Sequence, residues 1–290
     1  MLLIAVITQA ITFLPMAVGL YVSFCILRAT DMTLDGSFVL GAAVFARLIE
    51  AGFSPIFAGF AALISGALAG VGVSIMQHGQ KISSLLAGVL ATFILASGNL
   101  VVMGRPNISL LEKTTLLSQA FAQNQFSGWI LTACYSSVFC LLACIILASR
   151  YGLVLRAFGD NPALLARRGK NIEKYRMFGF AFTNMLASAS GCITAQTIGY
   201  ADIGMGFGMT LTALGAVILG KQLFSIFNRK EKFRITFEFG ACLCGVLFYF
   251  FAINGLLRLN IDPVYLKMFL GAILVLFLRA AKLSVAGDIQ

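Results

Sequence analysis

The chain has 290 residues, of which 60% are hydrophobic and 11% are charged, and its mean hydropathy is +0.95. This composition excludes a soluble globular domain and predicts an all-α, polytopic helical membrane protein in which one membrane domain fills the chain. The net charge of +10 does not indicate a nucleic-acid partner, because membrane proteins concentrate Lys and Arg in their cytoplasmic loops.

Apolar stretches of about the length that crosses a membrane as a helix recur from end to end of the chain. The first is too long for a cleavable signal peptide, and no basic segment precedes it. The second is short and contains Gly36 and Gly41, so we expect a broken or partial span there. About nine spans are predicted (roughly eight to ten): 2–27, 36–52, 55–76, 83–104, 128–149, 177–199, 205–223, 236–256 and 264–281.

The distribution of basic residues predicts the orientation of these spans. Cytoplasmic segments are enriched in Lys and Arg, which is known as the positive-inside rule. With the N-terminus outside and the C-terminus in the cytoplasm, five of the 21 basic residues lie outside, which leaves 16 inside. The five are Arg47, Arg105, Lys113, Arg258 and Lys267.

Two polar connections stand out between the predicted spans. The longest external one, 105–127, either packs over an external opening or meets an external partner, or it is a plain connector. On the cytoplasmic side, 156–176 is basic, and it begins like a helix because Asp160 or Asn161 can cap it and Pro162 suits the first turn. This second connection is either a surface for a soluble partner or an ordinary basic loop that sets topology.

The sequence predicts an inverted repeat. TDMTLDGSFVLGAAV (30–44) and ADIGMGFGMTLTALGAV (201–217) share an Asp, a Gly-containing break and a small-residue helix, and ISSLLAGVL (82–90) has a similar partner in IDPVYLKMFLGAIL (261–274). In the predicted topology each pair runs in opposite directions, a pattern typical of transporters whose halves meet at a central pathway. The repeats would be 1–104 and 177–290, joined by an external loop, a span and a cytoplasmic loop within 105–176.

Polar side chains within or at the edge of spans are candidates for a solute pathway, because they are costly in lipid. We expect Asp31 and Asp35 at the inner edge and Asp202 at the outer edge, with helix capping as the favoured role of Asp35 and Asp202. Asn99 and Asn184 lie deeper, where each either bonds between helices or lines the pathway. The candidate pathway residues are Asp31, Asp35, Gly36, Asn99, Asn184, Asp202 and Gly206.

No pattern typical of an enzyme or a metal site is found. The lone His78 lies in a polar loop, and most of the seven cysteines fall in apolar spans as small packing residues. The spacing from Gly215 to Lys221 fits a phosphate-binding loop, but Gln222 replaces the required Ser or Thr and an apolar span precedes it. We therefore expect no catalytic residues, no metal, and no ATP site or other cofactor in this chain.

Several stretches resemble one family of membrane proteins. RAFGDNPALLARRGKNIEKYR (156–176), YADIGMG (200–206), TDMTLDGSFVLGAAV (30–44) and MGRPNISLLE (103–112) are similar to the branched-chain amino acid permease superfamily of ABC transporters. They resemble its tryptophan/tyrosine-type subgroup more closely. The resemblance covers most of the chain, and Arg168 stands where the family has a small residue before Gly169.

The resemblance implies an inverted-repeat ABC importer permease in a prokaryotic plasma (inner) membrane. Such a subunit pairs with a second permease, here expected as a homodimer, and works with a cytosolic ATPase dimer and an extracytoplasmic solute-binding protein. The solute would be small and polar, with an aromatic amino acid as the subgroup's indication. The implied ATPase-coupling residues are Gly159, Asp160, Asn161, Pro162, Leu164, Leu165, Arg167, Arg168 and Gly169.

Leu164 and Leu165 are expected to form a small apolar face on this coupling helix, with Arg167 and Arg168 available for acidic residues of the ATPase. The main alternative function is a self-sufficient carrier or channel. An ion-driven carrier needs a coupling-ion site, and the few acidic residues within spans weigh against one. An intramembrane enzyme is a third class, disfavoured by the absence of a nucleophile and base pair.

Overall fold

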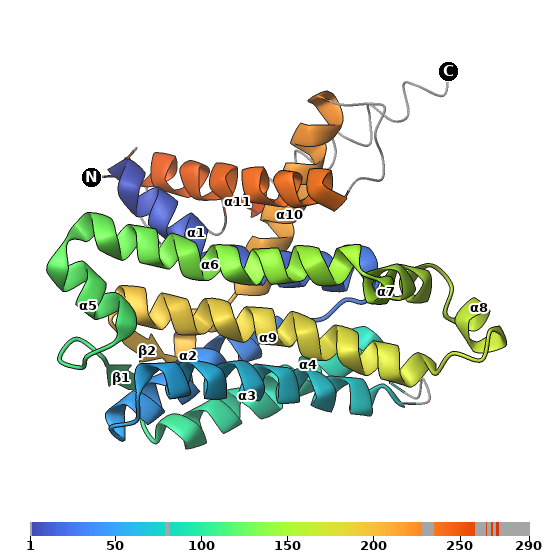
Figure 1. The fold of residues 1–290 in the computed structure, drawn as a ribbon, viewed down its shortest axis with the longest axis horizontal. Coiled ribbons are helices and arrows are strands. Elements are labelled where there is room, and N and C mark those ends of the chain that lie inside the picture. Colours follow the sequence, from blue (N-terminus) through green and yellow to red (C-terminus); the bar gives the residue numbers. More distant parts are fainter. Residues whose placement is uncertain are drawn as a thin grey trace.

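The computed structural model describes residues 2–78, 82–227 and 235–258, together with Tyr265, Met268, Gly271 and Ala272. These ranges are overwhelmingly helical, as the composition predicts (Figure 1). The long helices are α1 (Leu2–Tyr21), α2 (Leu34–Glu50), α3 (Pro55–Met76), α4 (Ser84–Met103), α6 (Gln125–Ala148), α9 (Ile172–Ile198), α10 (Met209–Phe227) and α11 (Ile235–Arg258). The short elements are the π-helix η1 (Val22–Ile26), β1 (Asn107–Ser109), α5 (Leu116–Gln123), α7 (Arg150–Asp160), α8 (Pro162–Arg167), β2 (Tyr200–Asp202) and the 3₁₀-helix η3 (Ile203–Gly206).

The observed helices follow the predicted spans with a few informative differences. Five of the described helical segments are long and apolar enough to cross a membrane: Val6–Ile26, Pro55–Met76, Ser84–Met103, Gln125–Ala148 and Ile203–Gln222. The sixth predicted span begins earlier than expected, because α9 starts at Ile172 and includes the end of the basic stretch. The ninth predicted span, 264–281, and the repeat segment 261–274 fall almost wholly outside the described residues.

Local sequence signals explain where several helices begin and end. The side chains of Ser54 and Ser83 cap α3 and α4 by accepting hydrogen bonds from backbone N–H groups in the first turn. Gly104 and Gly199 end α4 and α9 in the left-handed conformation that favours glycine. These residues separate the apolar stretches and thereby set the boundaries of the spans.

Helix α9 lies at the centre of the bundle and packs against α1, α2 and α3. Small residues permit this close packing: a Cβ at Gly41 of α2 would meet the backbone and side chain of Ser188, and one at Gly70 of α3 would meet the backbone of Phe180. The outward faces of α3, α4 and α6 carry exposed apolar side chains, for example Phe60, Phe93 and Leu141. A small-residue interior with an apolar exterior is the arrangement expected for a helical bundle in lipid.

The two ends of the bundle differ (Figure 1). The N-terminus, α5 and the β1–β2 pair lie at one end, whereas α7 and α8 lie at the other. The connection 105–127 is not a plain connector, because its strand β1 pairs antiparallel with β2 in the register Asn107↔Asp202, Ile108↔Ala201 and Ser109↔Tyr200. The predicted external loop and the predicted cytoplasmic loop are therefore at opposite ends of the molecule.

Candidate functional site

Two breaks between helices meet inside the bundle. The first is the non-helical segment 27–33, which we call the entry segment and which leads from η1 into α2. The second leads from α9 through β2 and η3 into α10. Helix α2 has 17 residues, which at 1.5 Å per residue gives about 25 Å, less than the roughly 30 Å of the hydrocarbon core. The second span is therefore short, as expected, but α2 is continuous through Gly36 and Gly41, and the break lies before it.

Asp35 joins the two breaks. Its carboxylate accepts hydrogen bonds from the backbone N–H of Gly208 at 3.2 Å, the N–H of Thr210 at 2.5 Å and the hydroxyl of Thr210 at 2.6 Å. A Cβ at Gly206 would meet the carbonyl oxygen of Asp35, so the second break also needs a glycine to approach this closely. The first turns of α2 and α10 are therefore in direct contact.

Asp35 caps a helix, as predicted, but this helix is not the one to which Asp35 belongs. The residue before α2 is Thr33, which makes no side-chain capping bond, and Asp35 lies within the first turn of its own helix. Its carboxylate caps the N-terminus of α10 instead, where a negative charge complements the positive end of the helix dipole. The sequence could not identify this distant helix start as the target.

Asp31 is buried inside the bundle, with 3% of the residue exposed, and its expected place at the inner membrane edge stays a prediction. Its carboxylate accepts bonds from the N–H of Thr33 and from the side-chain amide of Asn184, both at 2.9 Å. The carbonyl oxygen of the Asn184 side chain in turn accepts from the Ser37 hydroxyl at 2.6 Å. Asn184 therefore ties the centre of α9 to the entry segment and to α2.

Asn99 performs a similar role from α4. Its side-chain amide donates to the carbonyl of Gly36 at 3.1 Å, while its own side-chain oxygen is buried without a hydrogen-bond partner. The Thr92 hydroxyl donates to the carbonyl of Met32 at 2.9 Å. Of the two roles considered for Asn99 and Asn184, bonding between helices is the one the geometry displays. We call Asp31, Asp35, Ser37, Asn99, Asn184 and Thr210 the break cluster.

Asp202 is separate from the break cluster. Its carboxylate accepts from the N–H of Gly204 at 2.7 Å and from the side-chain amide of Asn107 at 3.3 Å. Asp202 thus caps η3 at the β1–β2 end of the bundle. The predicted capping role agrees with this geometry, and of the predicted acidic candidates only Asp31 and Asp35 belong to the break cluster.

At the opposite end, α8 forms a short helix whose start matches the sequence prediction. The side chain of Asn161 accepts from the N–H of Leu164 at 3.2 Å, and Pro162 occupies the first position. Asp160 does not cap α8. It ends α7, and its carboxylate pairs with the guanidinium of Arg28 at 2.6 Å.

The expected two-leucine face of α8 is wrong. Leu165 is 6% exposed and belongs to the main hydrophobic core, whereas Leu164 is 47% exposed. Arg167 and Arg168 are exposed, and Gly169 adopts a φ of 70° where the chain turns away from α8. The exposed surface of α8 is therefore one leucine flanked by two arginines, with Leu165 holding the helix to the bundle.

Sequence reasoning missed two arginines that organise this end. Arg28 is one of them, and it pairs with Asp160. Arg176 is 6% exposed and donates to the carbonyl of Gln77 at 2.9 Å and to the carboxylate of Glu173 at 3.0 and 3.2 Å. The spacing of Glu173 and Arg176, three apart on one helix, is the signal that could have identified this pair.

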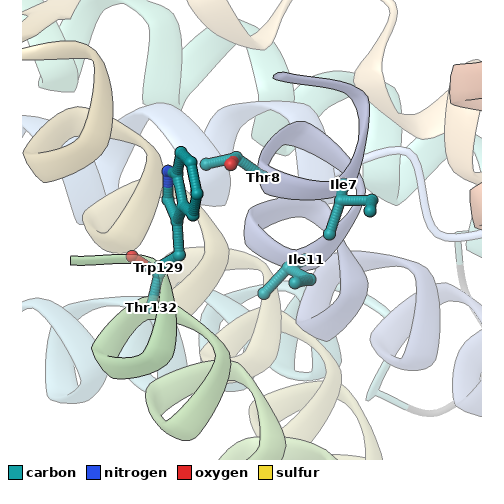
Figure 2. Close-up of a pocket in the computed structure, with 5 residues that line it drawn as sticks. All are labelled: Ile7, Thr8, Ile11, Trp129 and Thr132. Atoms are coloured by element: carbon teal, nitrogen blue, oxygen red, sulfur yellow. The ribbon is translucent and has the colours of Figure 1, made fainter. Parts of the chain in front are cut away.

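A small cavity lies between α1 and α6, and none of the break-cluster residues lines it (Figure 2). It has a volume of about 90 Å³ and a mainly apolar lining from Ile7, Thr8, Ile11, Trp129 and Thr132. No charged group contributes to it. Among the described residues, no three His, Cys, Asp or Glu side chains are grouped closely enough to hold a metal ion.

A polytopic bundle in which two broken helices meet at a buried polar cluster, with a capped helix projecting at one end, has the architecture of a membrane permease. The chain belongs to the family described as the branched-chain amino acid transport system permease component, which it matches over residues 2–278. It is therefore an ABC transporter permease component, a transport protein rather than a catalyst.

Relatives of known and unknown function match most of the chain. An uncharacterised protein of Rickettsia prowazekii (strain Madrid E) is 43% identical over 97% of this chain and 98% of its own length. The tyrosine transport system permease protein of Clostridioides difficile (strain R20291) is 30% identical over 98% of this chain and 92% of its own length. The ribose import permease protein of Escherichia coli (strain K12) is 25% identical over 90% of this chain and 79% of its own length. No solved structure gave a significant match.

Proposed function

We propose that this permease is the transmembrane subunit of an ATP-driven importer and that α8 couples it to a separate cytosolic ATPase dimer. The observation that carries the proposal is the form of α8. It is a short capped helix at one end of the bundle that exposes Leu164, Arg167 and Arg168. An exposed apolar anchor with flanking cations is suited to a groove with acidic residues at its rim.

The break cluster is proposed to be the element that rearranges during transport. It joins the starts of α2 and α10 through Asp35, and the start of α2 to α4 and α9 through Asn99 and Asn184. Broken helices of this kind form solute sites between the two halves of a transporter. ATP would be bound by the partner ATPase, with no cofactor in this chain.

An amino acid, with an aromatic one as the first candidate, is the proposed solute. The support is the similarity to the tyrosine transport system permease protein, which extends over nearly the whole of both chains. The positive end of α10 is already complemented by the carboxylate of Asp35. This favours an uncharged or zwitterionic solute over an anion, and it is compatible with both amino acids and sugars.

The proposed setting is a prokaryotic plasma membrane, with a second copy of the chain as the other permease subunit and an extracytoplasmic solute-binding protein at the β1–β2 end. The proposed orientation places the N-terminus and 105–127 outside, and 156–176, 224–235 and the C-terminus in the cytoplasm. A single cysteine replacing Lys170, in a background without the native cysteines, should resist an impermeant thiol reagent in intact cells and react after lysis. Labelling in intact cells would overturn the orientation.

The function is tested by purifying the tagged chain from its native membrane and measuring the ATP hydrolysis that accompanies it. We expect hydrolysis to co-purify, and uptake of labelled tyrosine into vesicles to require ATP and the binding protein. Uptake driven by an ion gradient, with no associated ATPase, would instead establish the alternative of a self-sufficient carrier. ATP-dependent uptake of ribose without tyrosine uptake would retain the importer and replace the solute.

A further inference from the structure

The entry segment is attached to α7 at its first residues. The guanidinium of Arg28 pairs with the carboxylate of Asp160 at 2.6 Å. One position earlier along α7, a Cβ at Gly159 would collide with the carbonyl oxygen of Ile26, so the two backbones touch. Arg28 has a φ of 50°, the one left-handed non-glycine residue among those described. The ion pair and the backbone contact together fix the end of α7, immediately before α8, to the start of the entry segment.

The entry segment is attached to the break cluster at its other end. Only two residues separate Arg28 from Asp31, whose buried carboxylate is held by Thr33 and Asn184. The stretch between them is itself braced, because the Ser23 hydroxyl and the Ala29 carbonyl are hydrogen-bonded at 3.0 Å and the N–H of Ala29 donates to the Ser23 carbonyl at 3.0 Å. A displacement at Arg28 therefore reaches Asp31 along a short, hydrogen-bonded path.

We propose that Arg28 and Asp160 are positioning residues for transport: their ion pair transmits movement of α8 through the entry segment to the break cluster. This inference rests on the proposed function, since it requires that an ATPase moves α8. Neither residue belongs to the break cluster, and Asp160 ends α7 rather than lying in α8. Their contribution is to make the coupling helix and the start of α2 move together.

The exposure of the Arg28–Asp160 ion pair distinguishes a role in coupling from a role in folding stability. The side chains of Arg28 and Asp160 are 63% and 64% exposed, and exposed ion pairs contribute little to folding stability. Loss of the pair should therefore leave the amount of folded chain unchanged. Coupling is the property that should change.

The test measures solute taken up per ATP hydrolysed by the complete transporter in vesicles. Arg28→Asp is the first variant, because aspartate tolerates the left-handed conformation at this position better than most residues. Asp160→Arg is the second, and the two together restore a pair with its charges exchanged. We expect each single variant to lower uptake per ATP by about tenfold, within the usual range of coupling between distant sites, and the exchanged pair to recover most of it.

Two controls keep the outcome interpretable. Arg105→Asp removes the guanidinium from an ion pair of the same 2.6 Å length with Glu50, at the opposite end of the bundle, and should leave uptake per ATP unchanged. The conservative Arg28→Lys keeps the charge and should retain most of the coupling. Single variants that couple like the original chain, or an exchanged pair as defective as the singles, would overturn the inference. Absence of any ATPase from the original complex would instead refute the proposed function.

Discussion

The two breaks are stabilised in different ways, although they meet at the same place. The first break enters from the α7–α8 end and is held by side-chain bonds: Asn184 of α9 bonds Asp31, and Thr92 of α4 bonds the carbonyl of Met32. The second enters from the β1–β2 end and is held mainly by backbone pairing with β1 and by the carboxylate of Asp35. Each end of the molecule is thus connected to the centre by one break.

This difference indicates how a signal from either side can reach one centre. In this account, a change at α8 reaches the start of α2 through the entry segment, and a change at the β1–β2 strands reaches the start of α10 through η3. Asp35 lies where the two routes meet, because it belongs to α2 and caps α10. The following predictions test the contrast between buried side-chain bonds and backbone pairing.

The largest effect is expected for Asn184→Leu, which removes the amide that bonds both Asp31 and Ser37. Leaving the buried carboxylate and hydroxyl without this partner should cost about 3 kcal/mol of unfolding free energy. Denaturant unfolding in mixed micelles would measure it. The matched Asn107→Leu variant removes an exposed bond to Asp202 at the β1–β2 end and should cost well under half as much. Equal losses in the two variants would contradict the contrast between the breaks.

A smaller loss of unfolding free energy is expected for a substitution at the contact between the two breaks. Gly206→Ala places a methyl group against the Asp35 carbonyl and the Val39 side chain, and such overpacking should cost about 1–3 kcal/mol and separate α2 from α10. In Gly98→Ala the new methyl group meets nothing within 4 Å, so this α4 variant should be neutral or slightly stabilising. Thermal unfolding of the two variants side by side would decide. A Gly206→Ala protein as stable as the Gly98→Ala protein would show that the contact is loose.

The smallest effect on stability is expected for Asp35→Asn. The amide oxygen can still accept from Thr210, but the amide NH2 cannot accept the weaker bond from the Gly208 N–H. The loss should be about 1 kcal/mol and should come from this bond and from the charge that complements the helix dipole. Uptake of a zwitterionic solute should fall by more than the small loss of stability explains, because the free positive end of α10 is then presented at the junction of the breaks. Unchanged uptake together with unchanged stability would indicate that the Asp35 charge is dispensable there.

The sequence predicted helices over the described spans, the approximate places of the two breaks and the start of α8, because these depend on local signals. Long apolar stretches, the Gly-containing segment after Asp202, and Asn161 followed by Pro162 are all visible without a fold. The first break, 27–33, contains no glycine, and Gly36 lies inside α2. The sequence did not predict that Leu165 is buried while Leu164 is exposed, since adjacent leucines on a six-residue helix carry no periodicity. The ion pair of Arg28 with Asp160 joins residues 132 positions apart, a juxtaposition that only the packing of η1 against α7 creates.

The relation of the two halves by a pseudo-twofold axis stays a prediction. The contact between Asp35 and the start of α10 agrees with it, because corresponding breaks of an inverted repeat should meet near the centre of the membrane. The later repeat pair depends on 261–274, which lies almost wholly outside the described residues.

The central claim is that α8 couples the permease to a cytosolic ATPase. Its most direct test asks whether the Leu164→Asp variant still associates with the ATPase. Leu164 is the exposed apolar residue of α8, and a buried interface anchor typically contributes about 2 kcal/mol or more, or roughly thirtyfold in affinity. Leu111→Asp makes the same change at a residue that is 77% exposed on the connection with β1, at the other end of the bundle. We predict that Leu164→Asp loses co-purifying ATP hydrolysis and uptake together, while Leu111→Asp keeps the ATPase. Full ATPase association and uptake in the Leu164→Asp variant would contradict the account.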